Sequence, residues 1–343
     1  MSRRVLSVVV DEAHVVSHWG SGFRKKYGTL GILRALLPKG TPFVAMSATL
    51  PERVRKDVLF KLQFDQNKFI YLNLGNDRPN VSLVVRAIQN PMNSYSDLDF
   101  LIPKRIRRED EVPKCFVYAD NVSGGLDMVD YIDGILPTEL QGKGIVQPYN
   151  AGLSQECRDL VMELFKEGLV RILVCTDAAG MVGNAINKWI ETDQITKGCN
   201  IPDIDIVVQW KLTTTVSSFV QRAGRVARAA GRTGLAVLLV EKSVYDADLD
   251  KPHQDDQRSK GKKYTQQSTS YTKSKSKDYA IKRGVLRGAY GGLSDEVAVG
   301  IEVPVDVSAS DEGAHSLVQS TTCRRGVLTT IYRNKKASKH QLS

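Results

Sequence analysis

Residues 5–30 read VLSVVVDEAHVVSHWGSGFRKKYGTL and carry the strongest structural signal in the chain. The run Val5–Val10 is apolar and rich in β-branched residues, which predicts a buried parallel strand. Asp11 and Glu12 follow directly, so two carboxylates lie at the carboxyl end of that strand. The residues after them suit contact with a nucleic-acid strand, because aromatic rings stack on bases and basic groups meet phosphates. The side chains concerned are Trp19, Phe23, Arg24 and Tyr27.

The paired carboxylates are typical of a site that hydrolyses ATP. Mg²⁺ prefers hard oxygen ligands, and one carboxylate can hold it together with nucleotide phosphates while its neighbour orients the attacking water. We therefore predict that Asp11 binds Mg²⁺ through ATP and that Glu12 acts beside it. The alternative is that DEAH is a chance helix N-cap, but the β-branched strand before it favours the ATP site.

Composition indicates a soluble chain of two or three domains, with 343 residues, 42% hydrophobic and 25% charged. The net charge of +10 favours a polyanionic partner such as nucleic acid, although much of the excess lies in one tail. Five cysteines without a CxxC pair indicate a reducing compartment and no disulfide framework. No apolar run approaches the roughly 18 residues of a membrane span, and the start does not read as a signal peptide.

Strand-like and helix-like segments alternate in two blocks, which predicts an α/β fold with parallel sheets and flanking helices. The first block spans 1–78, with a helix over 27–37, a strand over 42–46 and a helix over 50–64. The second spans 79–242, with strands over 114–119, 171–176, 205–210 and 234–240, and a helix over 154–168. Functional residues should gather at the carboxyl ends of the strands. Residues 243–283 are polar and Lys-rich and predict a disordered basic linker, and 284–343 would begin a small domain.

Three further motifs follow predicted strands. Ser47-Ala48-Thr49 is a weak signal that fits a link between an ATP site and a nucleic-acid site. In RILVCTDAAGM (171–181), Thr176 could touch a phosphate, and Asp177 and Gly180 are candidates for nucleotide contact, whereas Cys175 reads as a buried apolar residue.

The third motif is QRAGRVAR (221–228). Arg225 and Arg228 would share one face of a helix, where guanidinium groups can stabilise charge on a γ-phosphate, with Gln221 beside them. The alternative is a solvated basic helix face.

In this order, DEAH, SAT, FVYA, TDAAGM and QRAGRVAR resemble the motifs of superfamily 2 helicases. The aromatic loop narrows the resemblance to the RecQ family of DNA helicases, and the motif sequences are most similar to those of fungal members. The resemblance covers about 1–240 and 279–333. The nearest alternative is a DEAD-box RNA helicase, which the aromatic loop and Cys323-Arg324-Arg325 argue against. Further family-like landmarks are Arg78-Pro79-Asn80, Tyr149 to Leu153 with Arg158 and Phe165, and Leu328 with Tyr332.

The resemblance implies an incomplete first RecA-like domain (1–78), a complete second one (79–242), the linker, and a truncated zinc-binding-like segment (284–343). It implies ATP, Mg²⁺ and 3′–5′ unwinding of DNA in the nucleus. Gln221, Arg225 and Arg228 would then close on the phosphates. His14, Trp19, Phe23, Arg24, Tyr27 and Thr176 would serve the nucleic acid.

The sequence departs from the family in several places. The 343 residues contain no Gly-rich loop ending in Gly-Lys-Ser/Thr, so we expect this polypeptide not to turn over ATP. It could instead be a catalytically dead remnant that only binds nucleic acid or a protein, or a fragment of a gene model. Residues 182–197 interrupt a motif and would fit an unspliced short intron, or else a surface loop. Asn150 replaces an expected His.

Cys323 has no cysteine after it, and His315 and His340 match the family's ligand pattern poorly, so we expect no stable zinc.

Overall fold

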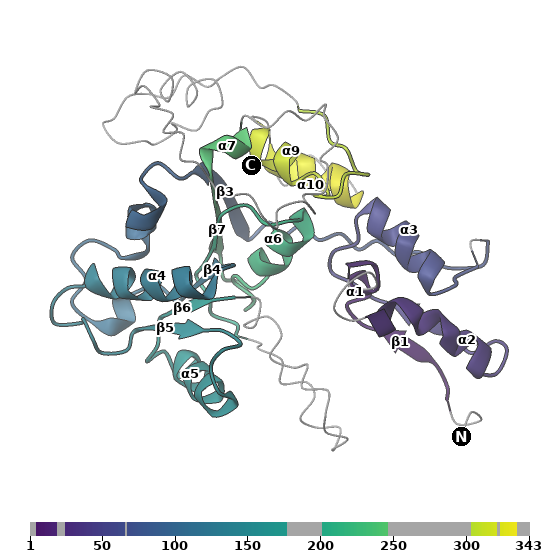
Figure 1. Cartoon of the computed structure of the whole chain (residues 1–343), viewed down its shortest axis with the longest axis horizontal. Coiled ribbons are helices and arrows are strands. Elements are labelled where there is room, and N and C mark those ends of the chain that lie inside the picture. The colour runs from purple at the N-terminus through teal and green to yellow at the C-terminus, as the bar shows by residue number, and fades with distance from the viewer. Residues whose placement is uncertain are drawn as a thin grey trace, which may run out of the picture. The chain divides into compact units, whose positions relative to one another are not determined.

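The computed structural model describes residues 5–18, 25–65, 67–176, 201–245, 303–320 and 323–334. The chain divides into two compact units. Unit 1 comprises Met1–Asp77, Thr215–Ser217 and Asp248–Ser343, and unit 2 comprises Arg78–Thr214 and Ser218–Ala247. Figure 1 labels the helices and strands of both units. The predicted insertion over 182–197 and most of the predicted linker lie outside the described residues.

The N-terminal part of unit 1 is built on two parallel strands. β1 (Val8–Val10) pairs with β2 (Phe43–Ala45) in the register Val8 to Phe43, Val9 to Val44 and Val10 to Ala45. Its helices are α1 (His14–His18), the 3₁₀-helix η2 (Lys25–Ile32), α2 (Leu33–Leu36) and α3 (Glu52–Lys61). A small core joins the acidic-box segment to α3 and consists of Val10, Ala13, Val16, Val54, Val58 and Leu62.

Two expectations for this part are corrected. The strand before the acidic box is parallel as predicted, but it is not buried on both faces, since the side chain of Val9 is 55% exposed. The helix expected over 27–37 is mostly 3₁₀, and only Leu33–Leu36 is α-helical. Gly31 lies so close to α3 that a Cβ there would overlap the carbonyl oxygen of Lys61. This close packing of backbone against backbone was not readable from helical spacing.

The C-terminal part of unit 1 contains α9 (Ala314–Gln319) and α10 (Arg324–Tyr332). It is attached to the N-terminal part by specific contacts. Asn73 donates to the carbonyl oxygens of Tyr332 and Arg333 at 2.9 and 3.0 Å, and Arg333 Nη1 lies 3.2 Å from Glu52 Oε2. Arg325 forms an ion pair with Asp77. The buried face of these helices is formed by Ala314, Leu317, Val318, Val327, Ile331 and Tyr332.

Unit 2 contains a six-stranded, wholly parallel sheet in the order β3-β8-β7-β4-β6-β5. Its strands are β3 (Val81–Ala87), β4 (Cys115–Ala119), β5 (Val146–Tyr149), β6 (Ile172–Cys175), β7 (Ile206–Trp210) and β8 (Gly234–Val240). The helices are α4 (Val122–Gly134), α5 (Gln155–Glu167), α7 (Lys242–Tyr245) and most of α6 (Val216–Ala223), of which residues 216 and 217 belong to unit 1. Three 3₁₀ turns cover Met92–Ser94, Ser96–Leu101 and Glu109–Glu111. The predicted α/β class, with a parallel sheet and flanking helices in the second domain, is confirmed.

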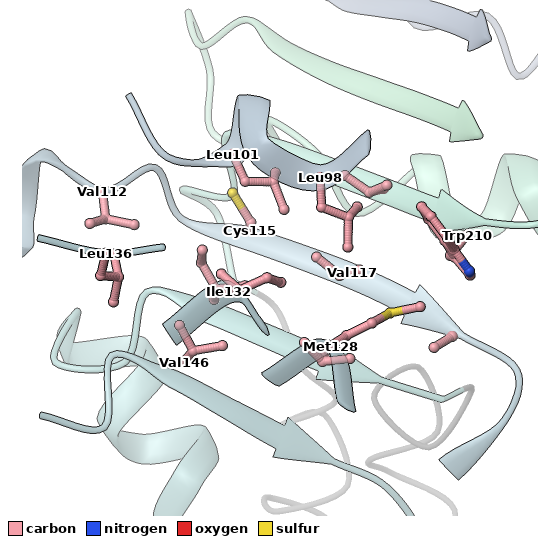
Figure 2. Packing of buried hydrophobic residues seen from close by; sticks show 14 of the residues in the cluster. Leu98, Leu101, Val112, Cys115, Val117, Met128, Ile132, Leu136, Val146 and Trp210 are labelled. Carbon is pink, nitrogen blue, oxygen red and sulfur yellow. The ribbon is translucent and has the colours of Figure 1, made fainter. Parts of the chain in front are cut away.

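Alternation along β4 explains why helices cover both faces of this sheet. Successive strand residues point to opposite faces. Cys115 and Val117 join a core with Leu98 and Ile132, as Figure 2 shows. On the opposite face, the ring of Phe116 stacks on Phe165 of α5 at 5.1 Å between ring centroids. The sheet therefore lies between α4 with the 3₁₀ turns and α5, and Figure 1 shows α4 and α5 on opposite sides of β5 and β6.

The last described helix of unit 2 corrects one predicted boundary. α7 covers residues 243–245, where the disordered linker was expected to begin, and both Val244 and Tyr245 are buried. The chain therefore stays packed for three residues after the predicted end of the block. The apolar side chains at 244 and 245 supply the reason, because a disordered segment would leave them in water.

Candidate nucleotide and nucleic-acid site

The acidic box lies at the carboxyl end of β1, as the sequence predicted. The main chain turns sharply there, since Glu12 has a positive φ of 47° and its amide donates to Asp11 Oδ1 at 2.8 Å. Ala13 donates to the carbonyl oxygen of Met46 at 2.8 Å, which ties the box to the end of β2. Asp11 and Glu12 are both exposed, whereas Ala13 is buried. The two carboxylates are thus presented to solvent from a fixed backbone.

His14 connects the acidic box to the Ser47-Ala48-Thr49 motif. Its Nδ1 lies 3.0 Å from Ser47 Oγ and 3.3 Å from Glu12 Oε2. Ser47 Oγ donates to the carbonyl oxygen of Thr49 at 2.8 Å, so its only hydrogen is already used. His14 must then donate from Nδ1, since a carboxylate accepts only. This geometry assigns a hydrogen to Nδ1 of His14.

The residues fit a bound Mg²⁺–nucleotide, as far as this chain supplies ligands. Asp11 offers a hard oxygen at a strand end, and Glu12 lies next to it. The described residues contain no group of three or more His, Cys, Asp or Glu that would hold a metal without the nucleotide. The remaining nucleotide candidates of the TDAAGM motif, Asp177 and Gly180, lie outside the described residues.

Most of the predicted nucleic-acid residues are not placed. Trp19, Phe23 and Arg24 lie outside the described residues, and only the backbone of Tyr27 is described, within η2. Thr176 follows the carboxyl end of β6, where its amide donates to the carbonyl oxygen of Tyr149 at 3.3 Å.

The Tyr149 to Leu153 landmark forms a compact turn next to Thr176. Asn150 is buried, and its Oδ1 accepts from the amide of Gly152 at 2.9 Å, so the residue that replaces the expected His stabilises this turn. Arg158 donates to the carbonyl oxygens of Ala151 and Leu153 at 3.3 and 3.1 Å. Asn150 and Arg158 therefore stabilise the backbone of the turn over residues 149–153.

The QRAGRVAR motif differs from the prediction in its secondary structure. α6 ends at Ala223, so Gln221 is helical but Arg225 and Arg228 are not, and they share no helix face. Both arginines lie in the loop over residues 224–233, which leads to the amino end of β8. The helix ends because Ala227 takes a positive φ of 46° and its amide donates to the carbonyl oxygen of Ile204, ahead of β7.

The sheet does not bring all candidates of unit 2 to one edge. Thr176 follows the carboxyl end of β6, whereas Arg228 precedes the amino end of β8. Because all strands of the sheet run parallel, Thr176 and Arg228 lie at opposite ends of the strands. The expectation that functional residues gather at the carboxyl ends is therefore wrong for Arg228. Asp11 and Glu12 belong to unit 1, whereas Gln221, Arg225 and Arg228 belong to unit 2.

Sequence reasoning missed Arg222, the buried arginine of the same motif. Its guanidinium hydrogen-bonds to Gln209 Oε1, lies 3.0 Å from Asp120 Oδ1 and sits over the ring of Tyr118 at 5.0 Å from the ring centroid. The side chain is only 7% exposed. Its burial depends on Gln209, Asp120 and Tyr118, which are distant in the sequence, so the motif itself carried no signal for it. Arg222 fixes α6 on the sheet, one residue after Gln221.

The zinc expectation concerns three residues near the end of the chain, Cys323, His315 and His340. Cys323 is exposed at the residue before α10, and His315 Nδ1 pairs with Asp311 Oδ2 at 2.8 Å. His340 lies outside the described residues. Whether the chain binds zinc stays a prediction. None of the helices in the described ranges has the length and hydropathy of a membrane span.

The fold and motifs of unit 2 match a known domain. The family model described as the helicase conserved C-terminal domain matches residues 95–230. Among solved structures, Mss116p bound to ssRNA and AMP-PNP aligns with a TM-score of 0.50 and 21% identity, covering 71% of this chain and 45% of that one. Such low identity shows the fold alone. Strands β4 to β7 and helices α4 to α6 lie within the residues that the helicase C-terminal model matches, so this part of unit 2 has the fold of that domain.

Curated relatives narrow the class. ATP-dependent DNA helicase RecQ of Pasteurella multocida is 28% identical over 248 residues, which cover 71% of this chain and 33% of that protein. ATP-dependent DNA helicase Q-like 2 of Arabidopsis thaliana is 26% identical over 342 residues, covering 96% and 43%. These matches show that the chain is similar to RecQ helicases from bacteria and plants. It spans about a third of the length of the bacterial relative. A Schizosaccharomyces pombe relative is also 28% identical, so kinship to fungal members stays a prediction.

Proposed function

We propose that this chain is part of an ATP-dependent DNA helicase that unwinds DNA in the 3′–5′ direction in the nucleus. The observation that supports this most directly is the link between DEAH and Ser47. His14 joins the exposed carboxylates after β1 to the motif after β2 by a 3.0 Å contact. A change in the position of Glu12 would therefore be felt at Ser47. The RecQ relatives, named as ATP-dependent DNA helicases, support the same reaction.

The residues of the two units have distinct proposed roles. Asp11 holds Mg²⁺ with the nucleotide, and Glu12 orients the attacking water. Bound Mg²⁺ would supply charge neutralisation on the phosphates. Gln221, Arg225 and Arg228 contribute from unit 2, where guanidinium groups offset negative charge on the γ-phosphate. Asp177 and Gly180 assist at the nucleotide, and Thr176 contacts the nucleic-acid backbone.

The aromatic-rich loop is the proposed DNA sensor. Trp19, Phe23 and Tyr27 would stack on bases, and Arg24 would contact phosphate. His14 precedes this loop in the chain, and its Nδ1 lies 3.0 Å from Ser47 Oγ. Binding of single-stranded DNA would thus act on the acidic box through the short helix α1.

A second candidate function is binding without catalysis. Its specific support is that the 343-residue sequence contains no Gly-Lys-Ser/Thr motif. The amides and the lysine of such a loop would bind the phosphates. Under this alternative, a polypeptide of these residues binds nucleic acid or a partner protein but does not hydrolyse ATP. DNA binding is common to both candidates, so it and ATP turnover must be measured separately.

The experiment combines DNA binding with ATPase assays on the purified 343-residue chain. We expect salt-dependent binding of single-stranded DNA that weakens at least fivefold in a Trp19→Ala/Phe23→Ala variant. Phe60→Ala is the matched control, because Phe60 is an aromatic on α3 that is 80% exposed and lies outside the loop. Equal losses in the control, or tighter binding of RNA than of DNA, would argue against the proposed DNA role. DNA-stimulated ATP turnover that Glu12→Gln abolishes would refute the expectation that these residues alone are inactive.

A further inference from the structure

The Arg78-Pro79-Asn80 segment, here called the RPN segment, reaches across unit 2 to the loop that carries Arg225 and Arg228. We call residues 224–233 the arginine loop. Arg78 donates from Nη1 to the carbonyl oxygen of Gly224 at 3.3 Å, and from Nη2 to those of Val226 and Ala227 at 3.0 and 2.8 Å. One guanidinium therefore holds three carbonyl groups on either side of Arg225.

Asn80 extends the same contact. Its Nδ2 donates to the carbonyl oxygens of Ala227 and Arg232 at 3.0 and 2.9 Å. Its Oδ1 accepts from Arg78 Nε at 3.2 Å, which orients the guanidinium toward the loop. The backbone carbonyl of Asn80 accepts from Gly234 at 3.0 Å, where β8 begins beside β3. The loop is therefore held at its start, middle and end by one short segment.

The arginine loop needs such support because its backbone is not self-sufficient. The last carbonyl groups of α6 accept from the backbone amides of residues 224–226, but the carbonyl groups that follow, at Gly224, Val226 and Ala227, accept from Arg78. A positively charged group at a helix C-terminus is also favourable for the helix dipole. Ala227 adopts a left-handed conformation at φ 46°, which a non-glycine residue holds only when its surroundings impose it.

The held backbone places two arginines in a defined position. Val226 and Ala227 are 0% and 1% exposed, so they anchor the loop between Arg225 and the exposed Arg228. The RPN segment and the loop together line a concavity of about 560 Å³, with Arg228 on its wall. A shift of the Ala227 carbonyl would move Arg228 directly, since the two residues are adjacent.

We propose that Arg78 and Asn80 are positioning residues for Arg225 and Arg228. They do not touch the nucleotide. They determine where the two guanidinium groups lie by holding the carbonyl oxygens of the arginine loop. This inference rests on the proposed role of Arg225 and Arg228 toward phosphates, and it adds the segment on which that role depends. A purely structural role for the RPN segment would stabilise unit 2 as a whole and would leave phosphate binding unchanged.

The first test measures amide hydrogen exchange in the full 343-residue chain. The informative amides are those of Arg225, Val226, Ala227 and Ala229, which donate to carbonyl oxygens of residues 222, 223, 204 and 202. We expect Arg78→Ala to speed their exchange at least tenfold, while amides of β4 change less than twofold. Arg78→Lys should not restore protection, because an ammonium cannot reproduce the fork of donors. Unchanged exchange, an equal rise in β4, or full rescue by lysine would overturn the proposal.

Two further variants sharpen this test. Asn80→Asp keeps the acceptor for Arg78 Nε but removes the amide donor, so loop exchange should rise at least threefold. Arg86→Ala is the matched control, since Arg86 is an exposed arginine on β3 that lies outside the RPN segment. Faster loop exchange in the control would show that any charge lost from this strand has the same effect, which would overturn the assignment.

The second test separates this inference from the proposed function. Inorganic tripolyphosphate, the phosphate chain of ATP, is titrated while the Nε–H signals of Arg225 and Arg228 are followed by NMR. We expect saturable shifts in the unsubstituted chain and at least a fivefold higher dissociation constant in Arg78→Ala, with the melting temperature of unit 2 changed by less than 3 °C. An unchanged dissociation constant in Arg78→Ala would overturn the positioning role. No saturable shift in the unsubstituted chain would instead refute the phosphate role itself.

Discussion

Replacing Arg222 by alanine should destabilise unit 2 by about 3 kcal/mol, and Gln209 should account for most of that loss. Gln209 is 0% exposed, and its Nε2 already donates to the carbonyl oxygens of Trp210 and Lys211 at 3.0 and 3.1 Å. Its Oε1 therefore points at Arg222 and cannot turn away. Leaving a buried acceptor without this donor costs roughly 1–3 kcal/mol.

The other two contacts of Arg222 should matter less. Asp120 is 55% exposed, so its ion pair resembles a surface pair of about 0–1 kcal/mol, and water replaces the guanidinium when it is lost. The contact with the Tyr118 ring at 5.0 Å contributes about 1 kcal/mol in a desolvated setting. The hydrogen bond to the buried amide is thus the dominant contribution.

Double-mutant cycles test this ranking. Arg222→Ala combined with Gln209→Ala should show a coupling energy of about 1–2 kcal/mol, because the double variant leaves no orphaned acceptor. The coupling with Asp120→Ala should stay below about 1 kcal/mol. Hydrogen exchange of the slowest amides in β4 and β7 measures the free energy of unfolding of unit 2. Arg86→Ala is the exposed control and should change that free energy by less than about 0.5 kcal/mol. A loss below about 1 kcal/mol for Arg222→Ala, or stronger coupling to Asp120 than to Gln209, would refute the reasoning.

Three further predictions concern other buried polar groups. Burial favours the neutral form of Asp311, yet hydrogen bonds from the His315 side chain and from backbone amides lower its pKa to about 2. Because this pKa lies below the ordinary value of 3.8, its contribution of about 2 kcal/mol is present above pH 4 and is lost as the pH falls toward 2. Acid-unfolding curves of the unsubstituted chain and Asp311→Asn should therefore converge there, and a constant difference would contradict it. Lys114 is 2% exposed and lies 3.0 Å from Asp203. In urea unfolding, Lys114→Met should change the free energy of unfolding by no more than about 1 kcal/mol, whereas Lys114→Ala should lower it by about 2–4 kcal/mol. A larger loss for Lys114→Met than for Lys114→Ala would contradict this prediction. Ser47→Ala should lower the stability of unit 1 by about 1 kcal/mol because it removes the contact with His14 Nδ1. The Glu12 carboxylate, 3.3 Å from Nδ1, should still keep the hydrogen there, so a switch of tautomer seen by ¹⁵N NMR of the ring would contradict the assigned donor.

The strands of unit 2 were predictable because their signal is local. The runs around Cys115–Ala119 and Ile172–Cys175 are apolar and bounded by polar residues, and the structure places β4 and β6 within one or two residues of the expected limits. Asp11 and Glu12 were placed correctly at the end of a parallel strand for the same reason. Hydrophobic pattern alone carries this information.

The errors arose where distant residues decide the local structure. Helical spacing placed Arg225 and Arg228 on one face, but α6 ends at Ala223, and the carbonyl groups of residues 224, 226 and 227 accept from Arg78, which lies about 150 residues away. Tertiary partners of this kind override local propensity. The burial of Arg222 and the exposure of Val9 depend in the same way on which elements pack nearby, and neither can be read from the neighbouring letters.

The position of β3 at the edge of the sheet has a consequence for biosynthesis. Its pairing partner is β8, in the register Val81 to Gly234 through Ala87 to Val240, so the first strand of unit 2 to leave the ribosome pairs with the last. At typical translation rates of about 5–20 residues per second, the roughly 150 residues between them take about 8–30 s to be made. During that interval β3 must wait with its edge open, whereas β4, β5 and β6 can already assemble. Nascent unit 2 should therefore depend on chaperones until β8 emerges, and a ribosome pause placed after Val240 should help it fold more than one placed before Gly234.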